Sequence, residues 1–206
     1  MGPYTLQLEI AGPTAMWTRP DTGDAPTSYP APTYSAVKGI FESVLWLQSA
    51  EVVPTKAEIC APVVYHAYTT NYGGPLREGA QIKGGNNYQL IATVLTNVCY
   101  RLYAEVRRAS RAAPEKWATV NGPHAYQEMF EERLARGQSW RTPCLGWQEF
   151  VPTYLGRFRL ATRVQESESQ TIPSMLREVI YGPGRSRRGE YRQNVRIEKG
   201  VLIYAA

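Results

Sequence analysis

Two stretches in which apolar and polar side chains alternate strictly constrain the fold of this chain more than any other feature. The more regular stretch covers residues 98–107, and the other covers residues 4–10 near the N-terminus. A period of two places the apolar side chains of a β-strand on one face and the polar ones on the other. Both stretches therefore predict half-buried strands. The N-terminal strand is predicted to end at Ala-Gly-Pro, residues 11–13.

Helices are predicted in two places. The first runs from about Ser35 to about Gln48, where apolar residues at helical spacing form one stripe: Ala36, Val37, Ile40, Phe41, Val44 and Leu45. Lys38 and Glu42 lie outside this stripe at i,i+4 spacing, where they either pair weakly with each other or reach a ligand. A short second helix is predicted over residues 125–136, ended by Gly137.

The other segments indicate loops and a late hairpin. Residues 17–32 and 71–87 are rich in glycine, proline and polar side chains, which is typical of long loops. Apolar residues on both sides of a Glu-Lys-Gly turn predict a hairpin over residues 195–203, and residues 182–189 indicate an exposed basic loop. The order of these elements predicts an α+β fold with an antiparallel sheet.

Length and composition exclude several classes of protein. The 206 residues suit a single domain. No apolar run approaches the roughly 20 residues of a membrane span, and the N-terminus lacks a secretory signal, so we expect a cytoplasmic protein with no membrane partner. The cysteines and histidines are too few and too widely spaced for a disulfide framework or a zinc site, and no cofactor is expected: Cys60, Cys99, Cys144, His66 and His124.

The charge pattern favours a nucleic acid as partner. The net charge is +5 and most cationic residues are arginine, whose planar guanidinium suits phosphates and bases. Basic and aromatic residues also lie next to each other, as in RNA-binding surfaces: Trp17 with Arg19, Arg101 with Tyr103, and Trp140 with Arg141. The alternative interpretation is that these tryptophans are core residues beside ordinary solvated arginines.

Signals for catalysis are sparse. The glycine-bearing loop over residues 73–85 has no nucleotide-binding spacing, so nucleotide hydrolysis is not supported. For acid–base chemistry the available groups are His124 and Tyr126, with Glu115 and Lys116 upstream.

Two segments of the chain resemble the Cas-five family of CRISPR-associated proteins, in its type I-C subtype. The first carries Thr-Arg-Pro at residues 18–20 and then the motif residues Pro32, Thr33, Ala36, Lys38, Gly39, Ile40, Glu42 and Trp46. The second carries Thr-Pro-Cys-Leu-Gly-x-x-Glu-Phe over residues 142–150. The likeness covers most of the chain and weakens toward the C-terminus.

The resemblance implies a fold and a role. The fold would be a ferredoxin-like (RRM-type) core over about residues 1–150, with a thumb-like hairpin or small C-terminal sheet over about residues 151–206, in one domain. The role would be an RNA-binding subunit of a type I CRISPR Cascade complex that holds the 5′ handle of the CRISPR RNA and caps the backbone in antiviral defence. Its partners would be the CRISPR RNA, the backbone subunits and the large subunit, with target DNA reached through the complex.

On this interpretation, four basic residues are expected to contact phosphates or bases: Arg19, Lys38, Arg77 and Arg141. Trp17 and Trp140 would be their stacking or packing partners. Arg19 and Lys38 match motif positions, and Arg77 lies in a loop that corresponds to a basic family segment.

Family members of this subtype usually also cut precursor RNA without a metal ion, using a tyrosine on the first helix and a Lys-His pair before the later helix. Leu45 stands where the tyrosine is expected, and the pair falls on Ala125 and Tyr126, or on Pro123 and His124 if two residues are inserted. The triad is therefore not intact, which favours a non-catalytic subunit. A metal-independent endoribonuclease that uses His124 and Tyr126 in a rearranged site stays open as the alternative, and an unrelated basic binding module is disfavoured.

Overall fold

The structure is a computed structural model and describes residues 4–72, 83–84, 88–109, 122–182, 184 and 186–204. Its helices and strands follow the chain in this order: β1 (Tyr4–Ala15), α1 (Tyr34–Val44), β2 (Ala50–Ile59), β3 (Tyr65–Tyr72), β4 (Tyr88–Arg108), α3 (Gly122–Ala135), β5 (Tyr154–Gly156), β6 (Gln170–Tyr181), β7 (Arg187–Glu198) and β8 (Val201–Ile203). The predicted α+β class with an antiparallel sheet is confirmed.

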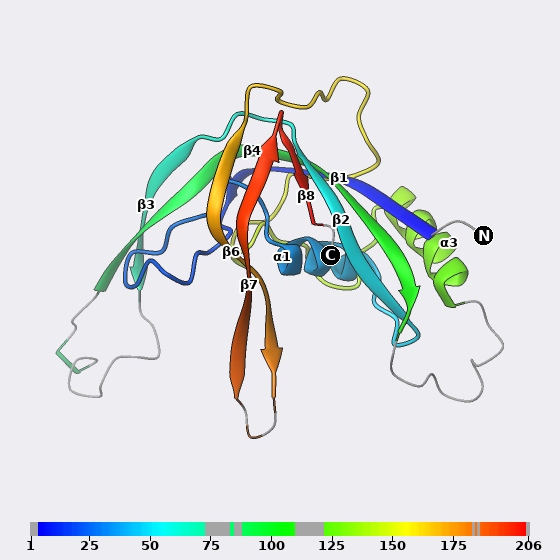
Figure 1. The fold of residues 1–206 in the computed structure, drawn as a ribbon, viewed down its shortest axis with the longest axis horizontal. Helices are drawn as coiled ribbons and strands as arrows, with labels where there is room; N and C mark the ends of the chain where they lie inside the picture. The colour runs from blue at the N-terminus through cyan, green and yellow to red at the C-terminus, as the bar shows by residue number, and fades with distance from the viewer. Residues whose placement is uncertain are drawn as a thin grey trace.

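One sheet connects the described strands in the order β5-β1-β4-β2-β8-β7-β6, and β3 pairs with β4 outside this path. The strand β4 is the longest, with 21 residues. Its C-terminal part lies between β1 and β2, and its N-terminal part pairs with β3. Two arms therefore extend from the body of the molecule in Figure 1, one made of β3 and β4 and one made of β6 and β7.

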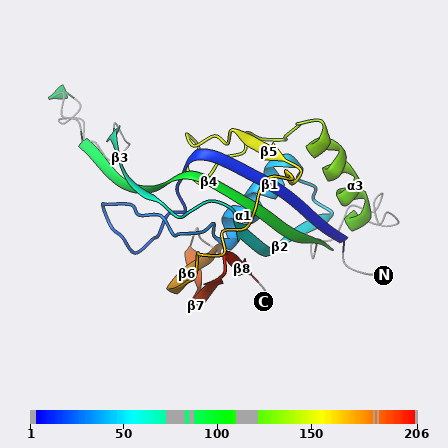
Figure 2. The same ribbon diagram turned by 90° about the horizontal axis from the view of Figure 1, so that it is seen from above.

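The helices α1 and α3 pack together beside this sheet. Phe41 of α1 contacts Phe130 of α3 with ring centroids 5.6 Å apart, and both helices contact β2. In the view of Figure 2, β5 lies beside β1, and α3 lies near the N-terminal end of β1. The core lies between these helices and the apolar side chains of β1 and β4, such as Leu8 and Leu102, which have no exposed surface.

The helix α1 has the predicted apolar stripe but ends four residues earlier than expected. The Thr33 hydroxyl caps its start by accepting a hydrogen bond from the Ala36 amide at 3.2 Å. Leu45 already has extended backbone angles, because the chain turns there toward β2. None of the helices in the described part of the chain is long and apolar enough to cross a membrane.

The prediction that Ala-Gly-Pro ends the first strand is wrong, because β1 continues through these residues to Ala15. A β-carbon on Gly12 would lie 2.6 Å from Leu145 Cδ1, so glycine lets the segment before β5 close over the strand. The register passes from the pair Gly12 and Val98 to the pair Thr14 and Thr96. Pro13 is thus accommodated within the strand although it has no amide donor.

The C-terminal hairpin is confirmed between β7 and β8, where Lys199 and Gly200 both have positive φ, 48° and 75°. The predicted basic loop over residues 182–189 is wrong in part, since Arg187 to Gly189 belong to β7. The partner strand β6 was not predicted. Its polar and apolar residues do not alternate regularly, and Pro173 interrupts them.

Candidate RNA-binding groove

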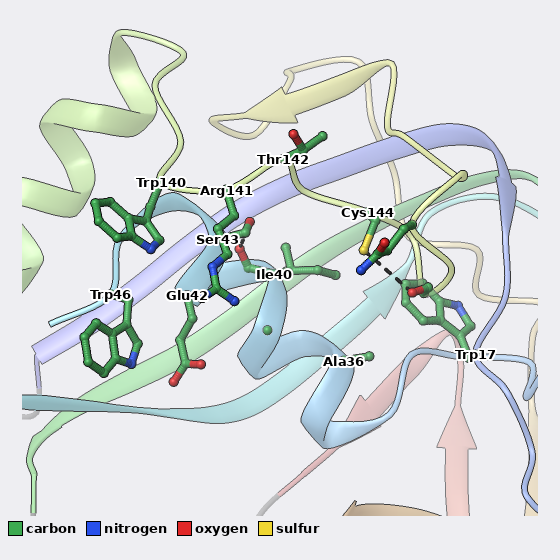
Figure 3. Close-up of a pocket in the computed structure, with 13 residues that line it drawn as sticks. Trp17, Ala36, Ile40, Glu42, Ser43, Trp46, Trp140, Arg141, Thr142 and Cys144 are labelled. Carbon is green, nitrogen blue, oxygen red and sulfur yellow. Dashed lines mark hydrogen bonds between the residues drawn. The ribbon is translucent and has the colours of Figure 1, made fainter. Parts of the chain in front are cut away.

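A groove of about 890 Å³ lies between α1 and the segment of residues 140–148, which leads from α3 toward β5 (Figure 3). The helix and the turn after it contribute Ala36, Gly39, Ile40, Glu42, Ser43 and Trp46. The facing segment contributes Trp140, Arg141, Thr142, Cys144, Gly146 and Gln148. The groove therefore joins the two segments that carry the family-like motifs.

Main-chain hydrogen bonds hold the segment of residues 140–148 in place. The amides of Trp140 and Arg141 donate to the carbonyl of Ser43 at 2.7 and 2.9 Å, which joins the segment to the last turn of α1. The Met16 amide donates to the Leu145 carbonyl at 2.8 Å. Because these bonds involve the backbone, the position of this segment relative to α1 does not depend on exposed side chains.

Gly146 allows the closest of these approaches. A β-carbon at this position would lie 1.8 Å from the Met16 carbonyl oxygen, and the residue has φ +96°. Only glycine combines this backbone conformation with this proximity. The glycine of the Thr-Pro-Cys-Leu-Gly motif is thus required by packing.

The Thr-Arg-Pro triplet also contacts this region. The Trp147 indole N–H donates to the Thr18 hydroxyl at 3.1 Å, and the Trp147 ring stacks on Phe150 with centroids 5.6 Å apart. All the motif segments named from the sequence therefore meet around one groove.

Two tryptophans present large exposed surfaces at one end of the groove. Trp46 is 53% exposed and Trp140 is 60% exposed, and Figure 3 shows them on opposite walls. Trp17 lies at the other end and is 2% exposed. Its indole N–H donates to the Tyr100 hydroxyl at 3.1 Å, so Trp17 is a packing residue, whereas Trp140 is open to a ligand.

The groove also holds two charged side chains, Glu42 and Arg141. Within the described part of the chain, neither the Glu42 carboxylate nor the Arg141 guanidinium forms a hydrogen bond or an ion pair. Burial raises the pKa of Glu42, an effect that nearby Lys38 opposes and Glu51 reinforces. Both groups are free to contact a bound molecule.

Two of the other predicted phosphate contacts, Arg19 and Lys38, have partners inside the protein. Arg19 donates to both carboxylate oxygens of Asp21, at 3.1 and 2.7 Å, and these hydrogen bonds lower the pKa of Asp21. Lys38 donates to Glu51 at 3.1 Å. Its hydrogen-bond partner is therefore Glu51, and not Glu42 as one of the predicted alternatives had it. Neither Arg19 nor Lys38 lines the groove.

Two further sequence-based candidates add nothing to the described groove. Arg77 lies outside the described residues, together with most of its loop. The pair of Arg101 with Tyr103 is engaged internally, because Arg101 donates to the carbonyls of Arg159 and Thr162 at 3.0 Å each.

The side chains of His124 and Tyr126 differ in exposure and in their partners. The His124 imidazole is exposed and lies 3.6 Å from the Glu128 carboxylate on the same helix. Tyr126 is 1% exposed, and its hydroxyl donates to the main-chain carbonyl of Leu45. The two residues thus have different surroundings and different partners.

Glu42 and Trp46 line the groove, although neither was among the residues predicted to contact RNA; both belong to the family-like motif. The sequence contained a signal for each residue. Glu42 lies outside the apolar stripe of α1, and Trp46 follows the C-terminal end of this helix. What the sequence did not show is that residues 140–148 lie opposite them.

Solved structures with similar folds include CRISPR-associated proteins. A crystal structure of a CRISPR-associated protein superimposes with a TM-score of 0.74 at 14% identity, covering 100% of this chain and 95% of that chain. A functionally uncharacterized protein from Streptococcus mutans, SMU1763c, gives 0.69 at 16% identity, with coverages of 98% and 92%. A chain of a CRISPR RNA-guided surveillance complex gives 0.57 at 16% identity, with coverages of 97% and 91%. These likenesses concern the fold.

Sequence comparison identifies the family. Two curated relatives carry the name CRISPR pre-crRNA endoribonuclease Cas5d. The one from Mannheimia succiniciproducens is 27% identical over 160 residues, which cover 70% of this chain and 69% of that protein. The one from Thermus thermophilus is 30% identical over 157 residues, which cover 72% of this chain and 62% of that protein. A family model described as CRISPR-associated protein (Cas_Cas5) matches residues 5–189, and the chain belongs to this family.

Proposed function

We propose that this chain is an RNA-binding subunit of a CRISPR RNA-guided complex and that the groove between α1 and residues 140–148 binds part of the CRISPR RNA. One observation carries the proposal: the motif-bearing segments meet at a groove with two exposed tryptophans and an arginine that has no partner among the described residues. Family membership and the names of the two relatives point to the same class of ligand.

The chemistry of the groove suits single-stranded RNA. Nucleobases stack on aromatic rings, with a contribution of about 1–3 kcal/mol per base, and Trp46 and Trp140 offer two such surfaces. Arg141 supplies a guanidinium for a phosphate. At about 890 Å³ the groove is as large as the clefts that hold small organic ligands.

The finer assignment follows the resemblance seen in the sequence. The chain would hold the 5′ handle of the CRISPR RNA in a type I Cascade complex, beside backbone subunits and a large subunit, and would meet target DNA through that complex. The strand order β5-β1-β4-β2, with α1 after β1 and α3 after β4, supports a ferredoxin-like core in a single domain, to which β6, β7 and β8 add the smaller C-terminal part.

Binding of fluorescently labelled CRISPR repeat RNA, measured by anisotropy at several salt concentrations, tests this function. Trp140→Ala and Arg141→Ala should each weaken binding by about ten-fold, and Arg141→Ala should also flatten the salt dependence, because one phosphate contact is lost. Arg196→Ala serves as the control, since Arg196 is exposed on β7 and outside the groove. Equal affinity and equal salt slope in all three variants would rule out the groove.

A second candidate function is cleavage of precursor CRISPR RNA, favoured by the names of both relatives. Attack of a 2′-hydroxyl on the adjacent phosphate needs general acid–base help and stabilisation of the charged phosphate. His124 is the exposed candidate for proton transfer, and Tyr126 is the other sequence-based candidate. End-labelled repeat RNA incubated in EDTA should give a product ending in a 2′,3′-cyclic phosphate, lost in His124→Ala, if this activity exists. Tight binding without a product would mean that the protein binds the RNA but does not cleave it.

A further inference from the structure

Glu42 is an unexpected residue in a groove that binds a polyanion. Its side chain is half-buried and lines the groove, and none of the described residues donates a hydrogen bond to its carboxylate. A carboxylate repels phosphates, so it weakens any ligand that approaches with its backbone. A half-buried acceptor without a donor is costly unless the ligand supplies the donor. The groove therefore calls for a ligand with N–H groups at this point.

Among the RNA bases, guanine fits such a carboxylate best. Its Watson–Crick edge carries two adjacent donors, N1–H and N2–H₂, which match the two oxygens of one carboxylate in the same way as an arginine fork does. Adenine and cytosine each place an unprotonated ring nitrogen beside their amino group, and that nitrogen would face a carboxylate oxygen. Uracil places its one N–H between two carbonyl oxygens.

The neighbours of Glu42 complete a site for one unpaired base. Trp46 lies beside Glu42 at the end of α1, and Trp140 and Arg141 lie on the facing wall (Figure 3). We infer that the groove selects an unpaired guanine, stacked on Trp46 and held by Glu42 through N1–H and N2–H₂, with an adjacent phosphate on Arg141. The inference rests on the proposed RNA-binding function and adds a base preference to it.

Removing one amino group from a single RNA base tests the inference with the unmodified protein. A short labelled oligouridine with one central guanosine is compared with the same oligonucleotide carrying inosine, which keeps N1–H and lacks the N2 amino group. Loss of one hydrogen bond to a charged acceptor should weaken binding about ten-fold or more. An oligonucleotide of uridine alone should bind still more weakly. Equal affinity for guanosine, inosine and uridine at the central position would overturn the inference.

The variant Glu42→Gln links the preference to this residue. Glutamine offers one acceptor and one donor, so it cannot accept from both guanine groups, and the guanosine and inosine oligonucleotides should bind with equal affinity. Glu131→Gln removes the same charge from an exposed position on α3 outside the groove and should keep the preference. Thermal unfolding of both variants checks that they are folded. A preference for guanosine that persists in Glu42→Gln would refute the role of this carboxylate.

The two proposals fail in distinguishable ways. If the protein binds the CRISPR repeat RNA and Trp140→Ala weakens that binding, the proposed function stands whatever the base preference. Equal affinities in the guanosine and inosine comparison then remove the guanine site alone. If neither the repeat RNA nor the oligonucleotides bind, the proposed function fails and the guanine site fails with it.

Discussion

The phenolic hydroxyl of Tyr126 donates a hydrogen bond to the main-chain carbonyl of Leu45, which ties α3 to the residue that ends α1. Burial raises the pKa of Tyr126, so the hydroxyl keeps its proton and acts as a donor. The end of α1 carries Trp46 into the groove, and this hydrogen bond helps to set where the helix stops.

Removing this hydroxyl should cost stability. In Tyr126→Phe the Leu45 carbonyl loses its buried donor, and we expect the free energy of unfolding to fall by about 1–2 kcal/mol. Urea denaturation measures the change. Tyr181→Phe is the matched control, because Tyr181 is 71% exposed, and its effect should stay within about 0.5 kcal/mol. A Tyr126→Phe protein as stable as the wild type would show that the bond contributes nothing net.

Gly146 should tolerate no side chain. In Gly146→Ala the new methyl group would overlap the Met16 carbonyl oxygen at 1.8 Å, with φ at +96°, and we expect a loss of about 3 kcal/mol or more. Gly137→Ala separates the two causes, because Gly137 has φ +64° but no atom within 4 Å of an added β-carbon. It should lose about 1–2 kcal/mol. Similar losses in both variants, measured by denaturation, would mean that the close approach to Met16 has little weight.

The buried carboxylate of Glu9 should make stability depend on acid pH. Its side chain has no exposed surface and accepts from the Arg159 amide at 3.0 Å and the Thr162 hydroxyl at 2.8 Å. Burial alone raises its pKa, but the hydrogen bonds from Thr162 and Arg159 outweigh this and lower it below the ordinary 4.5. A lowered folded-state pKa stabilises the protein above about pH 4.5, and this stabilisation is lost as the pH falls through the folded-state pKa.

The variant Glu9→Gln should be less stable than the wild type by about 2 kcal/mol at neutral pH, a value reduced by the partial exposure of Arg159. The difference should shrink as the pH falls below about 4.5 and through the lowered folded-state pKa of Glu9, because the wild-type carboxyl then becomes protonated as well. Denaturation curves at neutral and acid pH measure it. A difference that stays constant with pH would show that packing, and not charge, sets the effect.

Arg19 and Lys38 should contribute less to RNA binding than Arg141 does. Their charges are already balanced by Asp21 and Glu51, so binding a phosphate requires breaking an ion pair. Alanine at either position should change the salt slope of repeat-RNA binding by less than alanine at Arg141. A slope flattened more in Lys38→Ala than in Arg141→Ala would place the phosphate path on the Lys38 side of α1.

The amino-acid sequence by itself determined the elements whose patterns are local. The apolar stripe of α1 and the alternation in β1 and β4 specify which side chains turn inward, because the periods of helix and strand fix the direction of each residue. Thr33 and Gly137 likewise mark helix ends through their own chemistry. The motif segments were also visible as candidates for a functional site.

Only the tertiary structure decided which candidates are available to a ligand. Trp17 and Trp140 look alike in the sequence, yet one is 2% and the other 60% exposed. Lys38 and Arg141 were both basic candidates, but Lys38 is paired with Glu51 of β2, whereas Arg141 has no ion-pair partner among the described residues. The residues that face Glu42 and Trp46 come from about a hundred positions further along the chain. Burial and pairing depend on such distant neighbours, which the backbone brings together only when the sheet and helices have packed.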